Sequence, residues 1–299
     1  METKSFRGLW TALVTPFKSG NGLDNKVDYK ALKKLLEMQI EAKVTGVLLL
    51  GTTAENPTLE KKEAEKIVKF AVKILKGKTK IMVNIGTYCT KTSKENIKKY
   101  NKFKAIDAFL VVNPYYNKPT QTGLFQHFTT LAKATKKPII LYNIKGRTGV
   151  NLETNTLIDI ISECPNVIGV KEASGDMIQM KEVIEQTGDH FLVFSGDDGL
   201  TYELIQNDGD GVISVASNCI PEKMKIFVDT CFKGGEKASK LNEKYQEFFE
   251  KLFIQTNPLP AKTFLAEKGI IKETFRLPLC PMDQDKKEEF LKVIKKYKF

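Results

Sequence analysis

The chain has 299 residues, and its 47 lysines and arginines against 36 aspartates and glutamates give a formal net charge of +11. Hydrophobic residues make up 41% and charged residues 28%, as in ordinary soluble globular proteins. No apolar run approaches the ~18 to 20 residues of a membrane span, and the first seven residues lack the apolar core of a signal peptide. We therefore expect a cytoplasmic protein that does not contact a membrane.

Short apolar runs alternate with longer amphipathic stretches along most of the chain. The eight expected strands are, in order, 9–15, 46–50, 81–85, 108–112, 138–142, 167–171, 191–195 and 211–215. The helical patterns between them cover 27–42, 61–75, 93–103, 124–135, 154–164, 177–186 and 200–206, with Thr58 and Ser93 as expected N-caps. The strands are nearly continuous in Val, Ile, Leu and Phe, which is typical of parallel strands buried on both faces.

Eight strand-then-helix units predict an α/β fold, a (β/α)₈ or TIM barrel, which usually takes roughly 250 residues. An open doubly wound sheet is the alternative, but no GxGxxG follows the first strand. We place the barrel at 1–221 and its last helix with a C-terminal helical extension at 222–299. In the latter segment only helical patterns occur, at 236–254, 261–268 and 285–297.

Cysteine and histidine are too few for several kinds of chemistry. The five cysteines lack CxxC spacing, which disfavours a disulfide scaffold and a structural zinc site: Cys89, Cys164, Cys219, Cys231 and Cys280. The only histidines are His127 and His190. A metal-dependent aldolase or hydrolase usually needs two or three clustered imidazoles, so we expect no metal.

The positive charge alone would indicate a nucleic-acid partner, but the basic residues that carry it do not. Only Arg7, Arg147 and Arg276 are arginines, and the lysines are scattered over the expected helices. Nucleic-acid sites favour arginine for bidentate contacts and combine it with aromatic residues. We expect a solvated lysine-rich surface and no nucleic-acid partner.

Polar groups follow six of the expected strands, at the end of the barrel where active sites of this fold lie. These segments are Gly51-Thr52-Thr53-Ala54-Glu55, Asn113-Pro114-Tyr115-Tyr116-Asn117, Tyr142 to Gly149, Lys171-Glu172, Ser195 to Asp198 and Ser214 to Asn218. All of them are predicted to converge on one mouth.

Lys171 closes an apolar run and is the sharpest single signal. An ammonium among buried neighbours loses hydration, and the neutral amine is the nucleophile that a Schiff-base enzyme needs. A lysine paired with Glu172 is the structural alternative. Tyr142 closes the preceding strand, and its hydroxyl would carry protons beside an imine unless it is simply a core aromatic.

Four further residues extend this set. Thr53 and Tyr116 would continue a chain of hydroxyls, and Thr52 with Thr53 offers donors for a carboxylate, although a turn after a strand explains them equally well. Arg147 is conspicuous in a lysine-rich chain because a guanidinium binds carboxylate in a planar bidentate way. A loop-stabilising ion pair is its structural alternative.

Taken together and in order, these segments resemble the dihydrodipicolinate synthase family of pyruvate-dependent class I aldolases. The resemblance also includes Arg147-Thr148-Gly149, Gly169-Val170-Lys171-Glu172-Ala173, Gly211 to Val215 and Asn257-Pro258-Leu259-Pro260, and it covers the chain from about Gly8 to the C-terminal helices. It implies condensation of pyruvate with L-aspartate 4-semialdehyde in lysine and diaminopimelate biosynthesis, through an imine and without a metal or organic cofactor.

The resemblance also implies a role for each site residue. Lys171 would form the Schiff base, and Tyr142 would be the general acid and base. Thr53 and Tyr116 would relay protons, Tyr116 from a neighbouring subunit of a homodimer or homotetramer. Thr52 and Thr53 would bind the pyruvate carboxylate, and Arg147 would hold the carboxylate of the semialdehyde. Gly196 and Ile213 would contribute backbone carbonyls near the substrate and Lys171.

Substrate choice stays partly open. N-acetylneuraminate lyases resemble Gly-Ser-Thr at the first site and generally lack the arginine. The second threonine of Gly51-Thr52-Thr53 and the presence of Arg147 therefore favour the synthase over its lyase relatives, the N-acetylneuraminate lyases and keto-deoxy sugar acid aldolases. Lys145-Gly146 replaces a common Pro-Ser before Arg147, which adds flexibility and charge there. A non-catalytic barrel whose basic surface binds nucleic acid is the third hypothesis.

Regulation is expected to differ from that of lysine-inhibited members. Those members bind lysine through His, Asn and Glu side chains near the tyrosine that matches Tyr115. The corresponding positions here carry Lys61, Thr90 and Lys94. Cationic side chains would repel a cationic effector, so we predict weak or absent inhibition by lysine.

Overall fold

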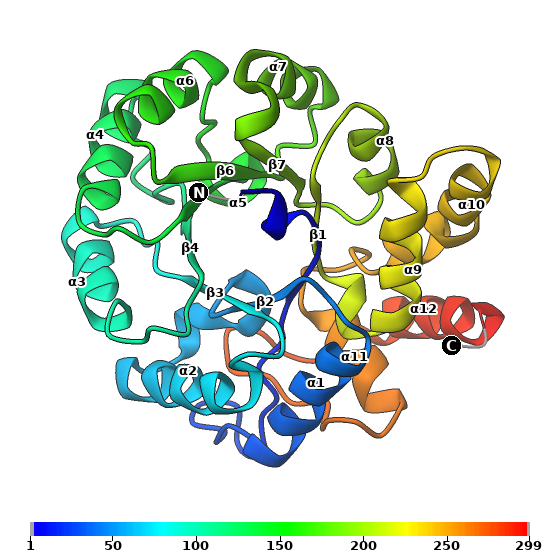
Figure 1. Cartoon of the computed structure of the whole chain (residues 1–299). Coiled ribbons are helices and arrows are strands. Elements are labelled where there is room, and N and C mark those ends of the chain that lie inside the picture. Colours follow the sequence, from blue (N-terminus) through cyan, green and yellow to red (C-terminus); the bar gives the residue numbers. More distant parts are fainter. Residues whose placement is uncertain (1–2, 298–299) are drawn as a thin grey trace.

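The computed structural model describes residues 3–297, in which eight parallel strands close into a barrel in chain order (Figure 1). The strands are β1 (Gly8–Ala12), β2 (Gly46–Leu49), β3 (Lys80–Asn84), β4 (Ala108–Val112), β5 (Ile139–Asn143), β6 (Val167–Glu172), β7 (Leu192–Ser195) and β8 (Gly211–Ser214). The predicted (β/α)₈ fold is confirmed, and all eight expected strands are present within two or three residues of their predicted ends.

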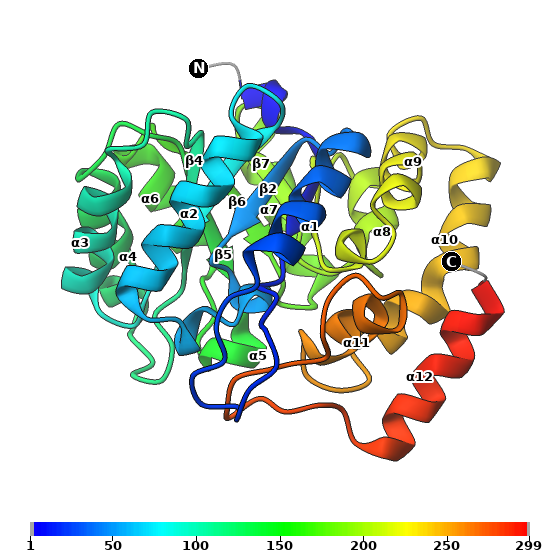
Figure 2. The same cartoon turned by 90° about the horizontal axis from the view of Figure 1, so that it is seen from below.

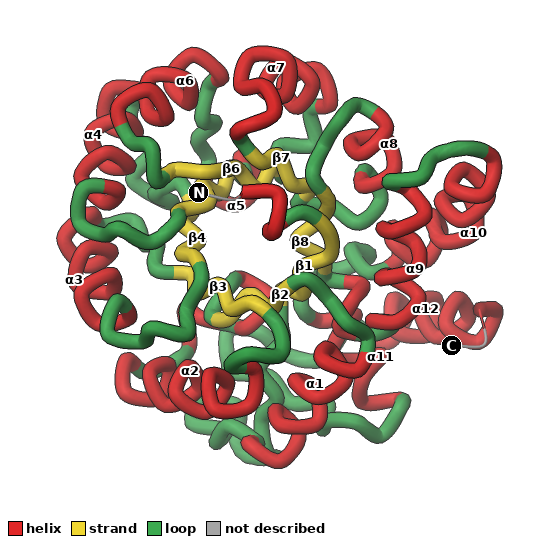
Figure 3. Tube along the Cα trace, viewed as in Figure 1, coloured by secondary structure: helices red, strands yellow, loops and turns green. Residues whose placement is uncertain are grey.

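Helices surround the strands, which form the inner ring in Figure 3. They are α1 (Tyr29–Glu41), α2 (Lys61–Leu75), α3 (Thr90–Tyr100), α4 (Gln121–Ala132), α6 (Thr154–Glu163), α7 (Met177–Thr187), α8 (Thr201–Gln206) and α9 (Pro221–Cys231). The short α5 (Lys145–Thr148) lies in the loop after β5. Among residues 3–297, the structure contains no helix with both the length and the apolar character needed to cross a membrane.

Alternation along each strand divides the core into two parts. Side chains that point inward fill the barrel: Trp10, Leu48, Met82, Leu110, Ile140, Tyr142, Phe194 and Ile213. Side chains that point outward pack with the helices in a much larger cluster. Both faces of every strand are therefore buried, which explains the continuous apolar runs in the sequence.

The N-terminal end of the barrel is closed by a short 3₁₀ helix, η1 (Thr3–Phe6). Phe6 stacks on Trp10 with ring centroids 5.9 Å apart, and the indole of Trp10 donates a hydrogen bond to the Phe6 carbonyl at 2.8 Å. In Figure 1 this segment lies over the centre of the ring. The opposite, C-terminal end carries the loops that hold the predicted site.

The C-terminal extension consists of α10 (Glu236–Lys251), α11 (Leu259–Glu267) and α12 (Gln284–Tyr297). Helix α10 packs on α9, and α12 packs on both α10 and α11. Figure 2 shows α11 and α5 on the side of the barrel opposite to the N-terminus. The extension thus contributes to the same end of the barrel as the strand-end loops.

Arg276, after α11, fastens the extension to the first two loops of the barrel. Its guanidinium donates to the backbone carbonyls of Asn25 and Thr58, at 2.6 and 2.9 Å, and forms a salt bridge with Glu63 at 2.6 Å. These contacts satisfy a largely buried guanidinium from several sides, as a buried charge requires.

Two predicted N-caps are wrong. Helix α3 begins at Thr90, and Ser93 lies inside its first turn, where the Ser93 hydroxyl accepts a hydrogen bond from the backbone of Thr87 at 2.9 Å. Helix α2 follows Glu60, and the Thr58 hydroxyl instead donates to the Glu55 carbonyl at 3.0 Å. Local hydroxyl–backbone bonds compete with capping at both positions.

Candidate active site

Lys171 and Tyr142 lie side by side at the C-terminal mouth of the barrel. They are paired residues of the neighbouring strands β6 and β5, and each is only 5% exposed. The Lys171 ammonium lies 4.3 Å from the centre of the Tyr142 ring. An amine and a phenol are thus adjacent in a site that is largely shielded from water.

A register shift in β6 directs Lys171 into the barrel. Ile139 pairs with Val167, but the next residue, Ile140, pairs with Gly169, so β6 contains one extra residue. Strict alternation from Val167, which belongs to the outer core, would turn Lys171 outward. The bulge reverses the facing of the residues after it and places Lys171 beside the inward-facing Tyr142.

Gly196, after β7, leaves the space that Lys171 occupies. A Cβ at this position would lie 2.5 Å from the Ala173 Cβ, 2.9 Å from the Glu172 carbonyl oxygen and 3.0 Å from the Lys171 Cε. The Gly196 N–H donates to the Glu172 carbonyl at 2.6 Å. A side chain at this position would therefore displace the lysine or the adjoining strand.

The turn after β2 presents Thr52 and Thr53 in a short 3₁₀ helix, η2 (Thr52–Ala54). Thr53 is buried, and its hydroxyl accepts a hydrogen bond from the Asn257 side-chain amide at 2.9 Å. Asn257 comes from the C-terminal extension, just before α11. The sequence contains it in a family motif, but no local pattern indicates that it reaches Thr53.

Arg147 lies on α5 and is exposed. Its guanidinium donates to the Asn257 carbonyl at 3.2 Å and to the Thr256 hydroxyl at 3.5 Å. Asn257 therefore contacts both groups that the sequence assigned to carboxylate binding, through its side chain to Thr53 and through its backbone to Arg147. Ile213 is fully buried inside the barrel, in the same cluster as Tyr142.

Tyr116 is not brought to this site within one chain. Its side chain is 92% exposed, and its φ of +75° is rare for a residue with a side chain. The preceding Tyr115 packs edge-on against Tyr88, with ring centroids 5.4 Å apart. The loop is thus held by Tyr115 while Tyr116 projects away from the protein.

Behind the mouth lies a buried polar network to whose members the sequence assigned no catalytic or substrate-binding role. The Asn113 amide donates to the Asn143 side-chain oxygen at 2.9 Å, and the Asn143 amide donates to Glu172 at 2.9 Å. The Ser174 hydroxyl donates to the other Glu172 oxygen at 2.8 Å. Burial raises the pKa of Glu172 to about 7, although both donors favour its ionised form.

Asp198 joins the loops after β7 and β8. It is fully buried, and one carboxylate oxygen accepts from the backbone N–H groups of Val215 and Ala216 at 3.0 and 2.9 Å. Burial raises the pKa of this carboxyl to about 6. With Glu172, it gives the strand ends a second layer of polar groups behind those that face the mouth.

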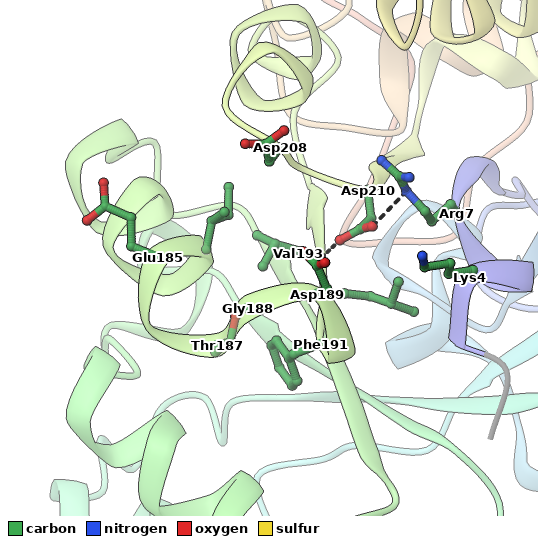
Figure 4. Close-up of a pocket in the computed structure, with 12 residues that line it drawn as sticks. Lys4, Arg7, Glu185, Thr187, Gly188, Asp189, Phe191, Val193, Asp208 and Asp210 are labelled. Atoms are coloured by element: carbon green, nitrogen blue, oxygen red, sulfur yellow. Dashed lines mark hydrogen bonds and ion pairs between the residues drawn. The ribbon is translucent and has the colours of Figure 1, made fainter.

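A cavity of about 360 Å³ lies elsewhere, at the N-terminal ends of β7 and β8 (Figure 4). Two of its charged groups are paired: Arg7 forms a salt bridge with Asp210 at 2.8 Å, and Asp210 also accepts from the Val193 N–H at 2.9 Å. No predicted site residue lines this cavity. Charges at this end of a barrel usually serve stability.

The arrangement at the mouth is suited to imine chemistry. An amine is adjacent to a phenol, and hydroxyl and guanidinium groups lie on the surrounding loops. Within residues 3–297, no three or more His, Cys, Asp or Glu side chains are grouped so that they could hold a metal ion.

Comparisons with known proteins agree with this geometry. A family model described as the dihydrodipicolinate synthetase family matches residues 5–297. The chain belongs to this family. A 4-hydroxy-tetrahydrodipicolinate synthase of Protochlamydia amoebophila is 41% identical over 292 residues, which cover 96% of this chain and 95% of that protein.

Solved structures show the same relationship. The crystal structure of dihydrodipicolinate synthase from Aquifex aeolicus has a TM-score of 0.93 and 38% identity, and the match covers 98% of both chains. The structure from Thermotoga maritima has the same TM-score, identity and coverage. The family therefore accounts for residues 5–297, including the C-terminal extension.

Proposed function

We propose that this chain is a lyase that condenses pyruvate with L-aspartate 4-semialdehyde, as a 4-hydroxy-tetrahydrodipicolinate synthase of lysine and diaminopimelate biosynthesis. The observation that carries the proposal is the buried Lys171 amine 4.3 Å from the Tyr142 ring at the barrel mouth. Membership of the family and the names of its relatives support the same reaction.

The proposed reaction begins at Lys171. Its neutral amine attacks the keto carbon of pyruvate, and loss of water gives an imine. The imine then loses a proton from the pyruvate methyl group and becomes an enamine, whose carbon attacks the aldehyde. Finally, the amino group of the semialdehyde portion closes the ring on the imine carbon and releases the lysine. No metal or organic cofactor takes part.

Tyr142 would move the protons in these steps, because it is the phenol beside the lysine. Thr53 would connect it to Tyr116 of a second copy of the chain. The 92% exposure of Tyr116 supports this role, since a side chain that projects from its own subunit is available to a neighbour. We accordingly propose a homodimer or homotetramer.

Substrate binding would involve both rims of the mouth. Thr52 and Thr53 would hold the pyruvate carboxylate, and Arg147 would hold that of the semialdehyde. The backbone carbonyls of Gly196 and Ile213 would lie next to the reacting atoms; this is supported by the position of Gly196, where a Cβ would lie 3.0 Å from the Lys171 Cε. The few cysteines without CxxC spacing support a reducing, cytoplasmic setting.

The first test is pyruvate-dependent condensation with L-aspartate 4-semialdehyde, coupled to a dihydrodipicolinate reductase, in the wild type and in Lys171→Ala. The wild type should turn over, and the variant should lose activity together with the adduct that borohydride traps from pyruvate. Lys181→Ala, which removes a partly exposed lysine of α7 that pairs with Glu203, is the control and should keep both activity and adduct.

Two results would contradict the proposal in different ways. An adduct on Lys171 without condensation would retain the aldolase mechanism and move the second substrate to a sugar acid, as in N-acetylneuraminate lyases or keto-deoxy sugar acid aldolases. No adduct at all, together with binding of DNA or RNA at physiological salt, would favour a non-catalytic barrel.

A further inference from the structure

A completely buried ion pair lies beside the active site. The Lys262 ammonium is 2.5 Å from the Glu55 carboxylate, and both side chains are 0% exposed. Lys262 also donates to the Thr274 carbonyl at 2.6 Å and lies over the rings of Phe17 and Phe275, at 4.5 and 4.6 Å from their centres. Every side of this ammonium is therefore contacted by protein.

Such a pair is a poor source of stability. Removing two charges from water costs several kcal/mol per ion, and apolar residues of similar size often serve stability as well or better. Burial lowers the pKa of Lys262 to about 8, which reflects this cost even though Glu55 acts in the opposite direction. The location of the pair, between the Gly51–Glu55 turn and α11, points to a role other than stability.

Glu55 ends the turn that carries the two threonines. Its backbone has a φ of +55°, the left-handed region that non-glycine residues rarely adopt, and its N–H donates to the Thr52 carbonyl at 3.0 Å. The second carboxylate oxygen of Glu55 accepts from the Arg276 backbone N–H at 3.1 Å. The extension thus holds a residue with a strained backbone two positions after Thr53.

Lys262 belongs to α11, and Asn257 lies just before that helix. Asn257 donates to the Thr53 hydroxyl at 2.9 Å and accepts from Arg147 at 3.2 Å. The turn and the helix are consequently joined at two points: by the ion pair, away from the mouth, and by the hydrogen bond between Asn257 and Thr53, at the mouth.

We propose that the Lys262–Glu55 ion pair is a positioning element of the active site. It fixes α11 against the Gly51–Glu55 turn and so sets where Asn257 holds Thr53 and Arg147. Lys262 and Glu55 touch no substrate; they act through Asn257 and the turn. The inference rests on the proposed function, because the proposed function assigns Thr53 to pyruvate binding.

The test measures how the trapping of pyruvate on Lys171 by borohydride depends on pyruvate concentration. Lys262→Met should raise the half-saturating concentration at least about tenfold, because the donors for the carboxylate lose their place. The adduct should still form fully at saturating pyruvate, since Lys171 and Tyr142 lie on β6 and β5 and not on the turn or on α11. Melting temperature is recorded for every variant.

The double variant Glu55→Gln/Lys262→Met separates positioning from stability. Removing one partner leaves an unpaired buried charge and destabilises the protein, whereas removing both charges relieves that cost. We expect the melting temperature of the double variant to recover while its half-saturating concentration stays high. If Lys262→Met does not fold, the half-saturating pyruvate concentration is measured on the double variant instead.

Lys287→Met is the matched control. Lys287 forms a 2.6 Å ion pair with Glu273 in the same extension, but neither residue contacts the turn. The Lys287→Met variant should have the same half-saturating pyruvate concentration as the wild type. The proposal is overturned if the half-saturating pyruvate concentration of the folded Lys262 variants stays within about twofold of the wild-type value. It is also overturned if, in the double variant, this concentration returns to the wild-type value together with the melting temperature. Absence of trapping in the wild type would instead contradict the proposed function.

Discussion

At the scale of single residues, Gly196 limits the space around Lys171. Its missing side chain leaves room where a Cβ would lie 2.5 Å from Ala173 and 3.0 Å from the Lys171 Cε. Side chains in a close-packed site have few alternative positions. The identity of this residue is therefore tied to the placement of the amine.

We predict that Gly196→Ala slows adduct formation with pyruvate by roughly 100-fold, because a shift of about 1 Å in a reacting group has an effect of that size. Trapping by borohydride in single-turnover experiments measures it. Gly146→Ala is the control, since a Cβ at Gly146 meets no atom within 4 Å. An adduct rate in Gly196→Ala equal to the control rate would show that Lys171 is not confined there.

Glu172 makes stability depend on pH. Burial raises its pKa to about 7, so the folded protein binds this proton more tightly than the unfolded chain. The stabilisation from the bound proton is complete below the ordinary glutamate pKa of 4.5 and is lost as pH rises through about 7. Asp198, with a pKa raised to about 6, acts in the same direction.

We predict that Glu172→Gln reduces the fall in melting temperature between about pH 5 and pH 8, because the substituted group no longer ionises. The contribution removed is on the order of 2–3 kcal/mol. Scanning fluorimetry over this pH range measures it, with Glu250→Gln, an exposed residue, as the control. Equal pH profiles of the two variants would contradict the assignment.

At the scale of secondary-structure elements, the eight strands were predictable and helix starts were less so. Each strand is a short apolar run between polar loops, and burial on both faces makes that signal strong. Helix starts depend on which neighbouring side chain supplies the cap. For α2 that contact comes from Glu60 and Glu63, whereas Thr58 was expected.

Helix α1 offers a clear test of capping. The Asp28 carboxylate accepts from the backbone N–H groups of Lys30 and Ala31 at 3.0 and 3.1 Å. We predict that Asp28→Ala lowers the free energy of unfolding by about 1 kcal/mol and the melting temperature by roughly 2 °C, with activity unchanged. Asp28→Asn, which keeps an acceptor, should melt near the wild type; equal loss in both would argue against capping.

At the scale of the whole molecule, the charge of the chain bears on its regulation. Lys61 lies at the start of α2, and Lys94 lies on α3; both are exposed. Thr90 is hydrogen-bonded to the His127 ring at 2.8 Å. The family resemblance predicts that these positions correspond to those through which lysine-inhibited members bind their effector.

We predict that L-lysine inhibits condensation weakly or not at all, because cationic side chains oppose a cationic ligand. Initial rates at increasing lysine concentration test this, with the pH and ionic strength held constant. Lys94→Glu, which restores an acidic group, should increase sensitivity. Half-inhibition of the wild type at low millimolar lysine would contradict the prediction.

The sequence by itself determined the order of the strands and the set of groups at their ends. Continuous apolar runs can only be buried on both faces, and parallel strands bring their carboxyl ends to one mouth. Lys171, Tyr142 and the threonine turn could be assigned on that basis, because the information is local to each strand and the segment that follows it.

Only the tertiary structure decided how these groups are aimed and held. The bulge that turns Lys171 inward depends on how β6 pairs with β5, which no local pattern specifies. The bond from Asn257 to Thr53 spans 204 residues, and the Lys262–Glu55 pair spans 207. Contacts so distant in sequence form only when the extension packs against the barrel, since packing and not local preference places it there.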